Sequence, residues 1–536
     1  MARIEGRVVA HGGTPQQARL AAGLTRPKEA AEITFMPPAM PLRFSTLIER
    51  ILPALGEAEV YLTGGAVRDM LMGRESHDFD FAVRIHAIEI ARRVARAFEA
   101  DFYVLDEGFD AARVIINTAG GPRDILDFAA FRGTDIDADL AGRDFTINAI
   151  AFDPRHGTLL DPLGGGSDLR AKLVRACSDT SIRDDAVRIL RAVRLAAALG
   201  FKIEIRTRAA LREAASFLQN VSAERQRDEL FRILGGPGPE AALKALDMLE
   251  TIPYFLPELS SMKGISQSPP HVYDVWDHTL AVIRHLGGIT EALAADSEAV
   301  RNREVFSGLL ALRLGRYRQH FQNHLSRRIT PDRPLRSLIF FAALYHDVSK
   351  PATRSVDAEG RIHFFGHEIE GAVVAADRAG KYNLSNDETS RVQAIVANHM
   401  RFNLFVERMQ RDNEAPNRRA IYRFFRAAGD TGLDLVALGL ADQWGMREHT
   451  LDQGSWEAAV EVARILLENY LERPHESVDP PRLLDGNDIM RAYGIQPGPA
   501  VGEVLEAIRE AEAVGEVRDR ETGLAFGRRW LEGRQS

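Results

Sequence analysis

Cysteine is almost absent from this 536-residue chain, and its scarcity limits the chemistry that the chain can use. The single cysteine, Cys177, excludes a disulfide framework within the chain and any zinc site built from several thiolates. Chains without disulfides are typical of reducing compartments, so the sequence favours a cytoplasmic protein.

Long apolar runs are missing as well. The longest, at 338–345 and 433–440, have the length of buried helices rather than of membrane spans. The first forty residues contain several acidic side chains and lack the apolar core of a signal peptide. We therefore expect no membrane partner. A proline-rich stretch at 36–41 is stiff and extended, and 1–42 is predicted to be a poorly ordered extension.

An excess of basic charge is also lacking. The chain carries 68 Lys and Arg against 76 Asp and Glu, a formal net charge of −8. This balance excludes a uniformly basic nucleic-acid-binding surface, so any RNA site must be a local patch.

The pattern of apolar residues divides the chain into segments, as its length requires. Strand-like and helical runs alternate up to about residue 168, and helical spacing dominates afterwards. A Gly/Pro cluster at 235–239 marks a boundary. The predicted fold class is α/β plus all-α, with an α/β head at 43–168, a helical neck at 169–235, a helical body at 236–472, and a linker with a helical tail at 473–536.

Two aspartates stand out in a strand-like run of the head. In a strand, Asp78 and Asp80 share one face while Phe79 and Phe81 occupy the other. Aspartate is disfavoured in strands, and two on one face repel each other. A divalent cation relieves that repulsion, and these oxygen ligands suit Mg²⁺.

A glycine pair precedes these aspartates. Gly64 and Gly65 lie before a helix predicted to begin near Val67, so backbone N–H groups at its N-terminus form an anion site that Arg68 can reinforce. A phosphate site beside a metal-binding carboxylate pair indicates phosphoryl or nucleotidyl transfer. The alternative for either half taken alone is a structural turn or an edge strand with outward-facing carboxylates.

Three stretches resemble one family. The sequence Gly-Gly-Ala-Val-Arg-Asp at 64–69, with Asp-Phe-Asp at 78–80, resembles the first motif of class II tRNA nucleotidyltransferases and bacterial poly(A) polymerases, members of the DNA polymerase beta superfamily. Residues 143–149 are similar to the family's Arg-Arg-Asp-Phe-Thr-x-Asn-Ala motif, and residues 184–191 to its Glu-Asp-x-x-Arg-x-x-Arg motif. The resemblance implies a polymerase-beta-like head and a neck that holds the nucleotide template.

The resemblance also implies roles for individual residues. Asp78 and Asp80 would hold the catalytic Mg²⁺, with Asp127 as a third carboxylate and Asp124 as its alternative. Asp185 and Arg188 would read the edge of the incoming base. Their spacing on a predicted helix would put them on one face, although a surface ion pair is the alternative. The implied nucleotide-binding residues are Gly64, Gly65, Arg68, Arg143, Asp144, Asp185, Arg188, Arg191 and Arg194.

The implied reaction adds C, A or both to the 3′ end of tRNA from CTP and ATP. Gly142 replaces the first arginine of the Arg-Arg-Asp motif, and the segment between Arg132 and Asp139 is short. Full CCA-adding relatives are longer there, so a CC-only or A-only enzyme is one alternative. A poly(A) polymerase is another, although its usual basic tail is missing. A hydrolase with a remnant head and a non-catalytic RNA-binding protein complete the alternatives.

Histidines of the body form a second pattern. An adjacent His-Asp pair with further imidazoles and carboxylates suits a divalent transition metal, and a metal-activated water would hydrolyse phosphoesters. The ordered series resembles the HD phosphohydrolase superfamily, including its binuclear subset, over roughly 270–445. A body without hydrolytic activity is the alternative, and His285 and His363 are predicted to be structural. The implied ligands are His278, His346, Asp347, His367, His399 and Asp442.

The tail contains a predicted pair of capped helices. Residues 481–502 resemble the C-terminal segment of the same nucleotidyltransferases, in which the body and tail hold tRNA. The glycines at 164–166 lack the Lys-Ser/Thr of a P-loop and predict a turn.

Overall fold

The computed structural model describes residues 2–4, 7–10, 21, 32–33, 46–117, 123–294, 305–331 and 333–535. These residues form two compact units. The first comprises Met1–Val221 with Met248–Thr251, and the second comprises Ser222–Asp247 with Ile252–Ser536.

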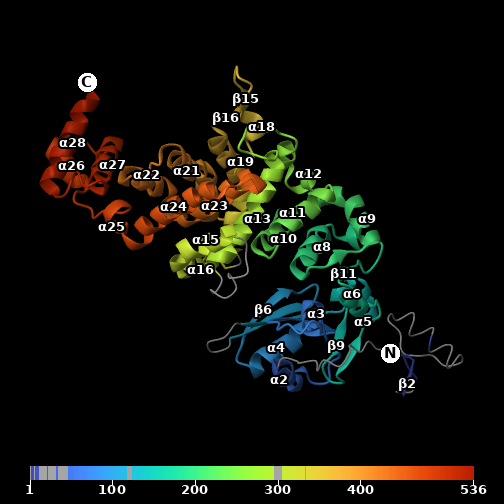
Figure 1. Cartoon of the computed structure of the whole chain (residues 1–536). Helices are drawn as coiled ribbons and strands as arrows, with labels where there is room; N and C mark the ends of the chain where they lie inside the picture. Colours follow the sequence, from blue (N-terminus) through green and yellow to red (C-terminus); the bar gives the residue numbers. More distant parts are fainter. Residues whose placement is uncertain are drawn as a thin grey trace. The chain divides into compact units, whose positions relative to one another are not determined.

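A seven-stranded mixed sheet organises the first unit, in the order β10-β9-β4-β5-β8-β7-β6 (Figure 1). Only β5 and β8 are parallel; the other neighbours are antiparallel. The strands are β4 (Val60–Thr63), β5 (Asp78–Val83), β6 (Asp101–Asp106), β7 (Ala111–Ile116), β8 (Asp124–Ala130), β9 (Ala151–Asp153) and β10 (Thr158–Leu160). The predicted α/β head is confirmed.

The two faces of this sheet differ. On one face, α2 (Thr46–Leu55), α3 (Gly64–Leu71) and α4 (Ala87–Ala97) contribute apolar side chains to a buried core. Phe79 and Phe81 of β5 point into that core, where Phe81 stacks on Phe128 with ring centroids 4.8 Å apart. Ala82 packs instead with residues of α5 (Ile136–Ala141) on the opposite face. The alternation therefore separates the phenylalanines from the two aspartates, as predicted.

The helical part of the first unit contains one break that the sequence did not predict. Residues 184–199 are not one helix, because α7 (Ser181–Asp184) ends before Asp185, and α8 (Arg188–Leu199) begins three residues after it. Asp185 is extended, with φ −152° and ψ 96°. Its Oδ1 accepts a hydrogen bond from the Val187 N–H at 3.4 Å, the kind of local bond that makes aspartate favour the start of a helix over its interior.

The second unit is almost entirely helical, which confirms the all-α part of the prediction. Every residue of α17 (Leu335–Tyr345) except Arg336 is buried, so the apolar run at 338–345 is a core helix. No helix among the described residues is both long and apolar enough to cross a membrane. The helices of the second unit include α10 (Ala223–Gly235), α13 (Val275–Ala294), α15 (Val305–Leu314), α16 (Arg318–Ser326), α17 (Leu335–Tyr345), α19 (His367–Lys381), α20 (Asn386–Asn398), α21 (Met400–Asp412), α22 (Arg418–Ala428), α23 (Gly432–Arg447) and α24 (Gln453–Leu467).

The helix pair predicted at 481–502 corresponds to α26 (Gly486–Tyr493) and the start of α27 (Pro499–Ala513), and a third helix, α28 (Arg520–Gln535), follows them in the tail. A capping box begins α26, since the Asp485 carboxylate accepts from the Asp488 N–H and the Asp488 carboxylate accepts from the Asp485 N–H. The tail has its own apolar core, which includes Ile489, Val504 and Ile508.

Within the predicted N-terminal extension, the structure describes a small antiparallel sheet. Its strands are β1 (Ala2–Ile4), β2 (Arg7–Ala10) and β3 (Glu32–Ile33), in the order β2-β1-β3. The remaining prediction for 1–42 falls mainly on residues outside those described.

Candidate functional site

Gly64 begins α3 directly after β4 and faces Asp80 on the neighbouring strand. Its φ is +73°, and a Cβ at this position would lie 2.6 Å from Asp80 Oδ2. Only glycine fits this close approach without a shift. The helix begins at Gly64 rather than near Val67, so its first N–H groups lie closer to the carboxylates than the sequence predicted.

Three carboxylates gather at this point of the sheet. Asp80 and Asp127 are register partners on the parallel strands β5 and β8, and Asp78 lies two residues before Asp80 on the same face. Asp127 accepts two hydrogen bonds from Arg113, at 2.7 and 2.8 Å. Asp124 lies at the start of β8 and pairs with His77 at 2.8 Å. Asp127, not Asp124, is therefore level with Asp80.

The environment of Asp80 disfavours its charge. Its side chain reaches solvent, yet the protein around it raises its pKa through desolvation, against the attraction of Arg143. Asp127 and then Asp78 raise the pKa of Asp80 further through repulsion. Clustered carboxylates that repel one another in a partly desolvated site suit a divalent cation, which would relieve that repulsion.

The predicted phosphate-binding arginine is held by its neighbours. Arg68 donates to both oxygens of Asp69, at 2.9 and 3.0 Å, and to Asn148 Oδ1 at 2.8 Å. Asn148 in turn donates to Asp144 Oδ1 at 3.1 Å. The first motif is thus joined by hydrogen bonds to the motif at 143–149.

Asp144 is buried and links this network to α8. Its Oδ1 accepts from the Phe145 N–H at 2.7 Å, and its Oδ2 accepts from Arg191 at 3.2 Å. Burial opposes the charge of Asp144, but Arg191 and the hydrogen bonds to Asn148 and Phe145 hold its pKa below the usual range. Asp144 is therefore an anion, and its carboxylate fixes the side chains of Arg191 and Asn148. Arg194 lies nearly one turn after Arg191 on α8.

Arg188 is buried and bound to backbone carbonyls. Its guanidinium donates to the carbonyl oxygens of Gly142 at 2.9 Å and of Arg143 and Ser181 at 3.1 Å each. Because Asp185 is extended, the expectation that Asp185 and Arg188 share a helix face is wrong. The structure instead separates them by a turn, and Arg188 ties α8 to the start of the motif at 143–149.

The chain from Arg132 to Arg143, which includes the short segment between Arg132 and Asp139, is closed on itself. Asp135 caps α5 by accepting from the Ala138 N–H at 2.9 Å. Asp139 is buried, and its two oxygens accept from the Arg132 N–H and from Arg143 Nε, each at 3.0 Å. One carboxylate therefore holds both ends of the segment.

The predicted HD ligands converge inside the second unit. They form two buried groups, within each of which one ligand atom per residue lies within 4.8 Å of the others. The first group is His278, His346 and Asp442; the second is Asp347, His367 and His399. Asp347 faces both groups: its Oδ2 lies 3.2 Å from His346 Nε2, and its Oδ1 lies 3.4 Å from His367 Nε2.

Backbone carbonyls fix the orientation of three of these imidazoles. The Nδ1 atoms of His346, His367 and His399 lie 2.7, 2.6 and 2.7 Å from the carbonyl oxygens three residues earlier. A carbonyl only accepts, so each Nδ1 carries the proton and each Nε2 presents a lone pair. This is the arrangement that metal-binding histidines adopt.

Several buried atoms in this cluster have no hydrogen-bond partner. They are Nδ1 and Nε2 of His278, Nε2 of His346 and both oxygens of Asp347, although Asp347 Oδ2 forms an ion pair with Lys350 Nζ at 2.7 Å and His278 Nε2 lies 3.0 Å from Asp442 Oδ1. The lone pairs of His367 and His399 face each other, with their Nε2 atoms 3.3 Å apart. Such groups are costly to bury unless a cation lies between them, so these residues fit a metal centre. Histidine nitrogens with carboxylates suit a transition metal.

The two histidines predicted to be structural lie outside the ligand groups. His285 bonds to Glu448 at 2.7 Å and stacks on Trp444, and His363 lies in the strand β16 (Ile362–Phe364), paired with Asp357 at 2.8 Å. The sequence reasoning missed Lys350, which is buried with its Nζ 2.7 Å from Asp347 Oδ2. Its position three residues after Asp347 on a helical pattern was the available signal.

Three family profiles match segments of the chain. The poly A polymerase head domain matches residues 60–175, the probable RNA and SrmB-binding site of polymerase A matches 200–263, and the HD domain matches 275–421. Together they cover the head, the helices after it, and most of the histidine cluster.

Full-length relatives decide the family. The CC-adding tRNA nucleotidyltransferase of Thermus thermophilus is 31% identical over 484 residues, which is 89% of this chain and 95% of that protein. The chain belongs to the tRNA nucleotidyltransferase family. The A-adding tRNA nucleotidyltransferase of Deinococcus radiodurans is 33% identical over 479 residues, 88% of this chain and 95% of that protein.

Solved structures of tRNA nucleotidyltransferases share the fold. The complex structure of CCA-adding enzyme with CTP aligns with 91% of this chain and 95% of its own, with a TM-score of 0.56 and 22% identity. Similarity at this identity establishes the architecture of an α/β head followed by helical segments.

Proposed function

We propose that the chain transfers nucleotides from CTP or ATP to the 3′ end of tRNA at the site formed by Asp78, Asp80 and Asp127. One observation carries this proposal: Asp80 and Asp127 lie in register on adjacent strands, and the N-terminus of α3 directly adjoins them. Carboxylates and helix N–H groups together suit a metal–nucleotide complex. Mg²⁺ bound there would stabilise negative charge on the transferring phosphate.

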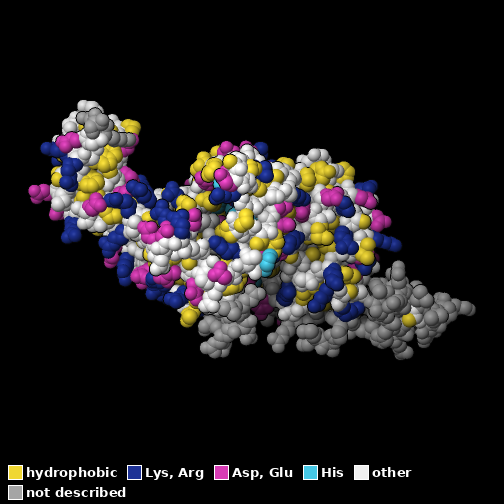
Figure 2. All heavy atoms as spheres, turned by 45° about the horizontal axis from the view of Figure 1, so that its top comes forward, with side chains coloured by type: hydrophobic (Ala, Val, Ile, Leu, Met, Phe, Trp, Pro, Cys, Tyr) yellow, Lys and Arg dark blue, Asp and Glu magenta, His cyan; other side chains and the backbone are white. Residues whose placement is uncertain are grey.

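In this reaction the tRNA 3′-hydroxyl oxygen forms a bond to the α-phosphorus and loses its proton. The bond from that phosphorus to the β-phosphate oxygen breaks, and pyrophosphate leaves. The α3 N-terminus would bind phosphate oxygens, and Asp144 would orient Arg191 towards the same region. Basic and acidic side chains are interspersed on the face that Figure 2 shows, consistent with a local rather than a continuous RNA site.

We further propose that the chain adds either CC or the terminal A, but not all three nucleotides. A change from C to A addition requires the proposed template residues, Asp185 and Arg188, to move. Arg188 opposes such a movement, because it ties the start of α8 to the carbonyl oxygens of Gly142 and Arg143. Asp139 closes the adjoining segment, which leaves little chain to absorb such a movement. The two full-length relatives described above bear names of CC-adding and A-adding enzymes, which supports this restriction.

Time courses on tRNA transcripts test the restriction. Transcripts ending before C74, C75 and A76 are incubated with CTP, ATP or both, at enzyme concentrations far below the tRNA. We expect efficient extension either to CC or from CC to CCA. Smooth accumulation of complete CCA ends from a tRNA that lacks all three nucleotides would contradict the proposal, because it would show that the closed segment permits the switch.

Asp185→Ala should blur nucleotide selection. The proposed template reads the base with protein hydrogen bonds, and losing one to a charged group costs on the order of 1.5–3 kcal/mol. Selectivity for CTP or ATP over UTP and GTP is compared between variant and wild type. Asp184→Ala is the matched control, since Asp184 ends α7 and accepts from Thr180. Unchanged selectivity of Asp185→Ala would mean that Asp185 does not read the base.

For the second unit, we propose a divalent transition-metal centre with phosphohydrolase activity. Supporting observations are the two ligand groups, the lone pairs fixed by backbone carbonyls, and the two Asp347 oxygens that face both groups. A metal bound there would lower the pKa of a coordinated water. Hydrolysis forms a bond from water oxygen to the substrate phosphorus, breaks the phosphoester bond, and passes a proton to the leaving alcohol. Against the effect of burial, His346 and then Lys350 lower the pKa of the Asp347 carboxyl, so Lys350 would help to keep it ionised.

A further inference from the structure

Asp442 uses its two carboxylate oxygens differently. Its Oδ1 lies 3.0 Å from His278 Nε2, within the first ligand group. Its Oδ2 accepts a hydrogen bond from Asn403 Nδ2 at 2.5 Å. One oxygen is thus directed to the proposed metal, and the other is held by a residue on α21.

A continuous series of hydrogen bonds begins at Asn403. Gln443 Nε2 donates to Asn403 Oδ1 at 2.8 Å, and Arg447 Nη1 donates to Gln443 Oε1 at 2.6 Å. Gln443 is buried, and Arg447 follows it by one turn on α23. Two side chains, Asn403 of α21 and Gln443 of α23, therefore connect Asp442 to the cationic Arg447.

The direction of every bond in this series follows from Arg447. A guanidinium only donates, so Gln443 must present its carbonyl oxygen to Arg447 and its amide nitrogen to Asn403. Asn403 must then present its oxygen to Gln443, which turns its N–H donors towards Asp442. With this orientation, Asn403 can only donate to the carboxylate, as an outer partner of a metal ligand should.

Close packing of the two helices makes this series possible. A Cβ at Gly439 of α23 would lie 2.4 Å from the ring of Phe402, so this ring can lie against the backbone of α23 only because residue 439 is glycine. Phe402 is fully buried and directly precedes Asn403. The contact therefore brings Asn403 beside two consecutive residues of α23, Asp442 and Gln443.

We propose that Asn403, Gln443 and Arg447 form a positioning relay that orients Asp442 as a ligand of the metal centre. The inference rests on the metal centre proposed above and assigns its outer support. Outer partners of this kind fix the ligand's geometry, and their loss typically weakens metal binding by about 10- to 100-fold.

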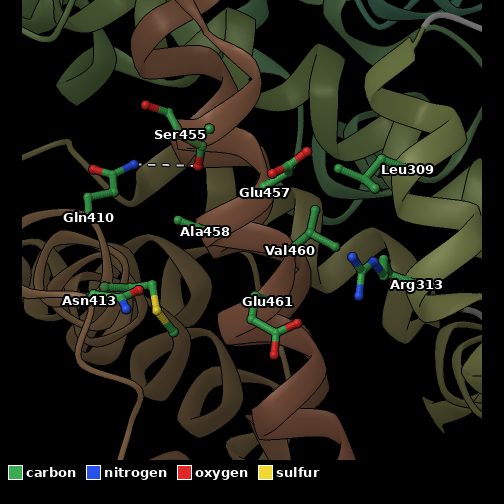
Figure 3. A pocket seen from close by; sticks show the side chains of 11 residues that line it. Leu309, Arg313, Gln410, Asn413, Ser455, Glu457, Ala458, Val460 and Glu461 are labelled. Carbon is green, nitrogen blue, oxygen red and sulfur yellow. Dashed lines mark hydrogen bonds between the residues drawn. The ribbon is translucent and has the colours of Figure 1, made fainter.

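A second branch leaves Arg447 in the other direction and supplies a matched control. Arg447 Nη2 donates to Gln410 Oε1 at 3.3 Å, and Gln410 Nε2 donates to the Ser455 carbonyl at 3.4 Å. Figure 3 shows this bond beside a groove lined by residues of α15, α21 and α24. The groove has a volume of about 700 Å³. Gln410 thus contacts the same arginine without lying between it and Asp442.

The relay is tested by calorimetric titration of Mn²⁺ into the metal-free full-length protein. We expect two ions at the second unit of the wild type, in addition to any ion that the head carboxylates bind, and in Asn403→Ala binding of one of these two that is weaker by about tenfold or more. Gln443→Leu, which keeps the volume and removes the amide, should weaken the same ion. Gln410→Ala should bind both ions as the wild type does. Thermal unfolding of each metal-free variant is measured alongside.

The outcomes distinguish failure of the relay from failure of the metal centre. Wild-type affinity for both ions in Asn403→Ala or in Gln443→Leu overturns the relay and leaves the metal centre standing. Equal weakening in Gln410→Ala also overturns it, because the effect would then follow packing around Arg447 rather than the path to Asp442. A wild type that binds no ion at these residues overturns the metal centre itself. If Asn403→Ala does not fold, Gln443→Leu decides.

Discussion

Asp80→Asn is expected to reduce nucleotide addition by at least about 10³-fold, the upper range for removing one group that stabilises transition-state charge. The substitution preserves shape and removes the anion that lies level with Asp127 and against Gly64. Single-turnover addition of CTP or ATP to tRNA measures the effect. Metal binding in the second unit should stay unchanged, because its ligands come from other residues.

The matched control for Asp80→Asn is Asp124→Asn. Asp124 lies on the adjacent strand and pairs with His77, away from the level of Asp80 and Asp127. This variant should retain most of the activity. Substantial addition by Asp80→Asn, or an equal loss in Asp124→Asn, would contradict the assignment of the catalytic carboxylates.

Asp347→Ala should remove both metal ions from the second unit, whereas His367→Ala should remove only one. Asp347 is the residue whose oxygens face both ligand groups, one towards His346 and the other towards His367. Its loss also leaves Lys350 buried without its anionic neighbour, which costs stability. Metal analysis of the purified proteins measures the stoichiometry, and any phosphohydrolase activity should vanish in both variants.

His285→Ala serves as the control for these substitutions. His285 lies on the same helix as His278 but bonds to Glu448 and stacks on Trp444. It should keep both ions. Equal metal content in Asp347→Ala and the wild type would refute the bridging role, and retained nucleotide addition in all three variants would confirm that the first unit remains intact.

The sequence predicted the head well because its signals are local. Alternation of period two separated Asp78 and Asp80 from Phe79 and Phe81, and the glycine pair located the close turn. The break at Asp185 was missed for a physical reason. Apolar residues on both sides continue the helical spacing, while the preference of aspartate for the residues before a helix acts through one weak bond to the Val187 N–H.

The ligand series of the body could be found from the sequence, but not its pairing. Spacing along the chain does not reveal that Asp347 faces both groups, since the groups come from helices far apart in sequence. Asn403 and Lys350 gave weaker signals, because a single polar residue on a helix is usually a solvated one. Their roles depend on packing between helices, such as the contact of Phe402 with Gly439.

The closed segment between Arg132 and Arg143 also bears on how enzymes of this kind can change length. Because the Asp139 side chain holds both ends, additional residues inserted after Gly133 would leave those ends in place. Loop closure is inexpensive, about 0.6 kcal/mol for each doubling of length. Insertions and deletions at this point therefore change the reach of the segment without unfolding the head, which makes it a site where evolution can lengthen or shorten the protein with little loss of stability.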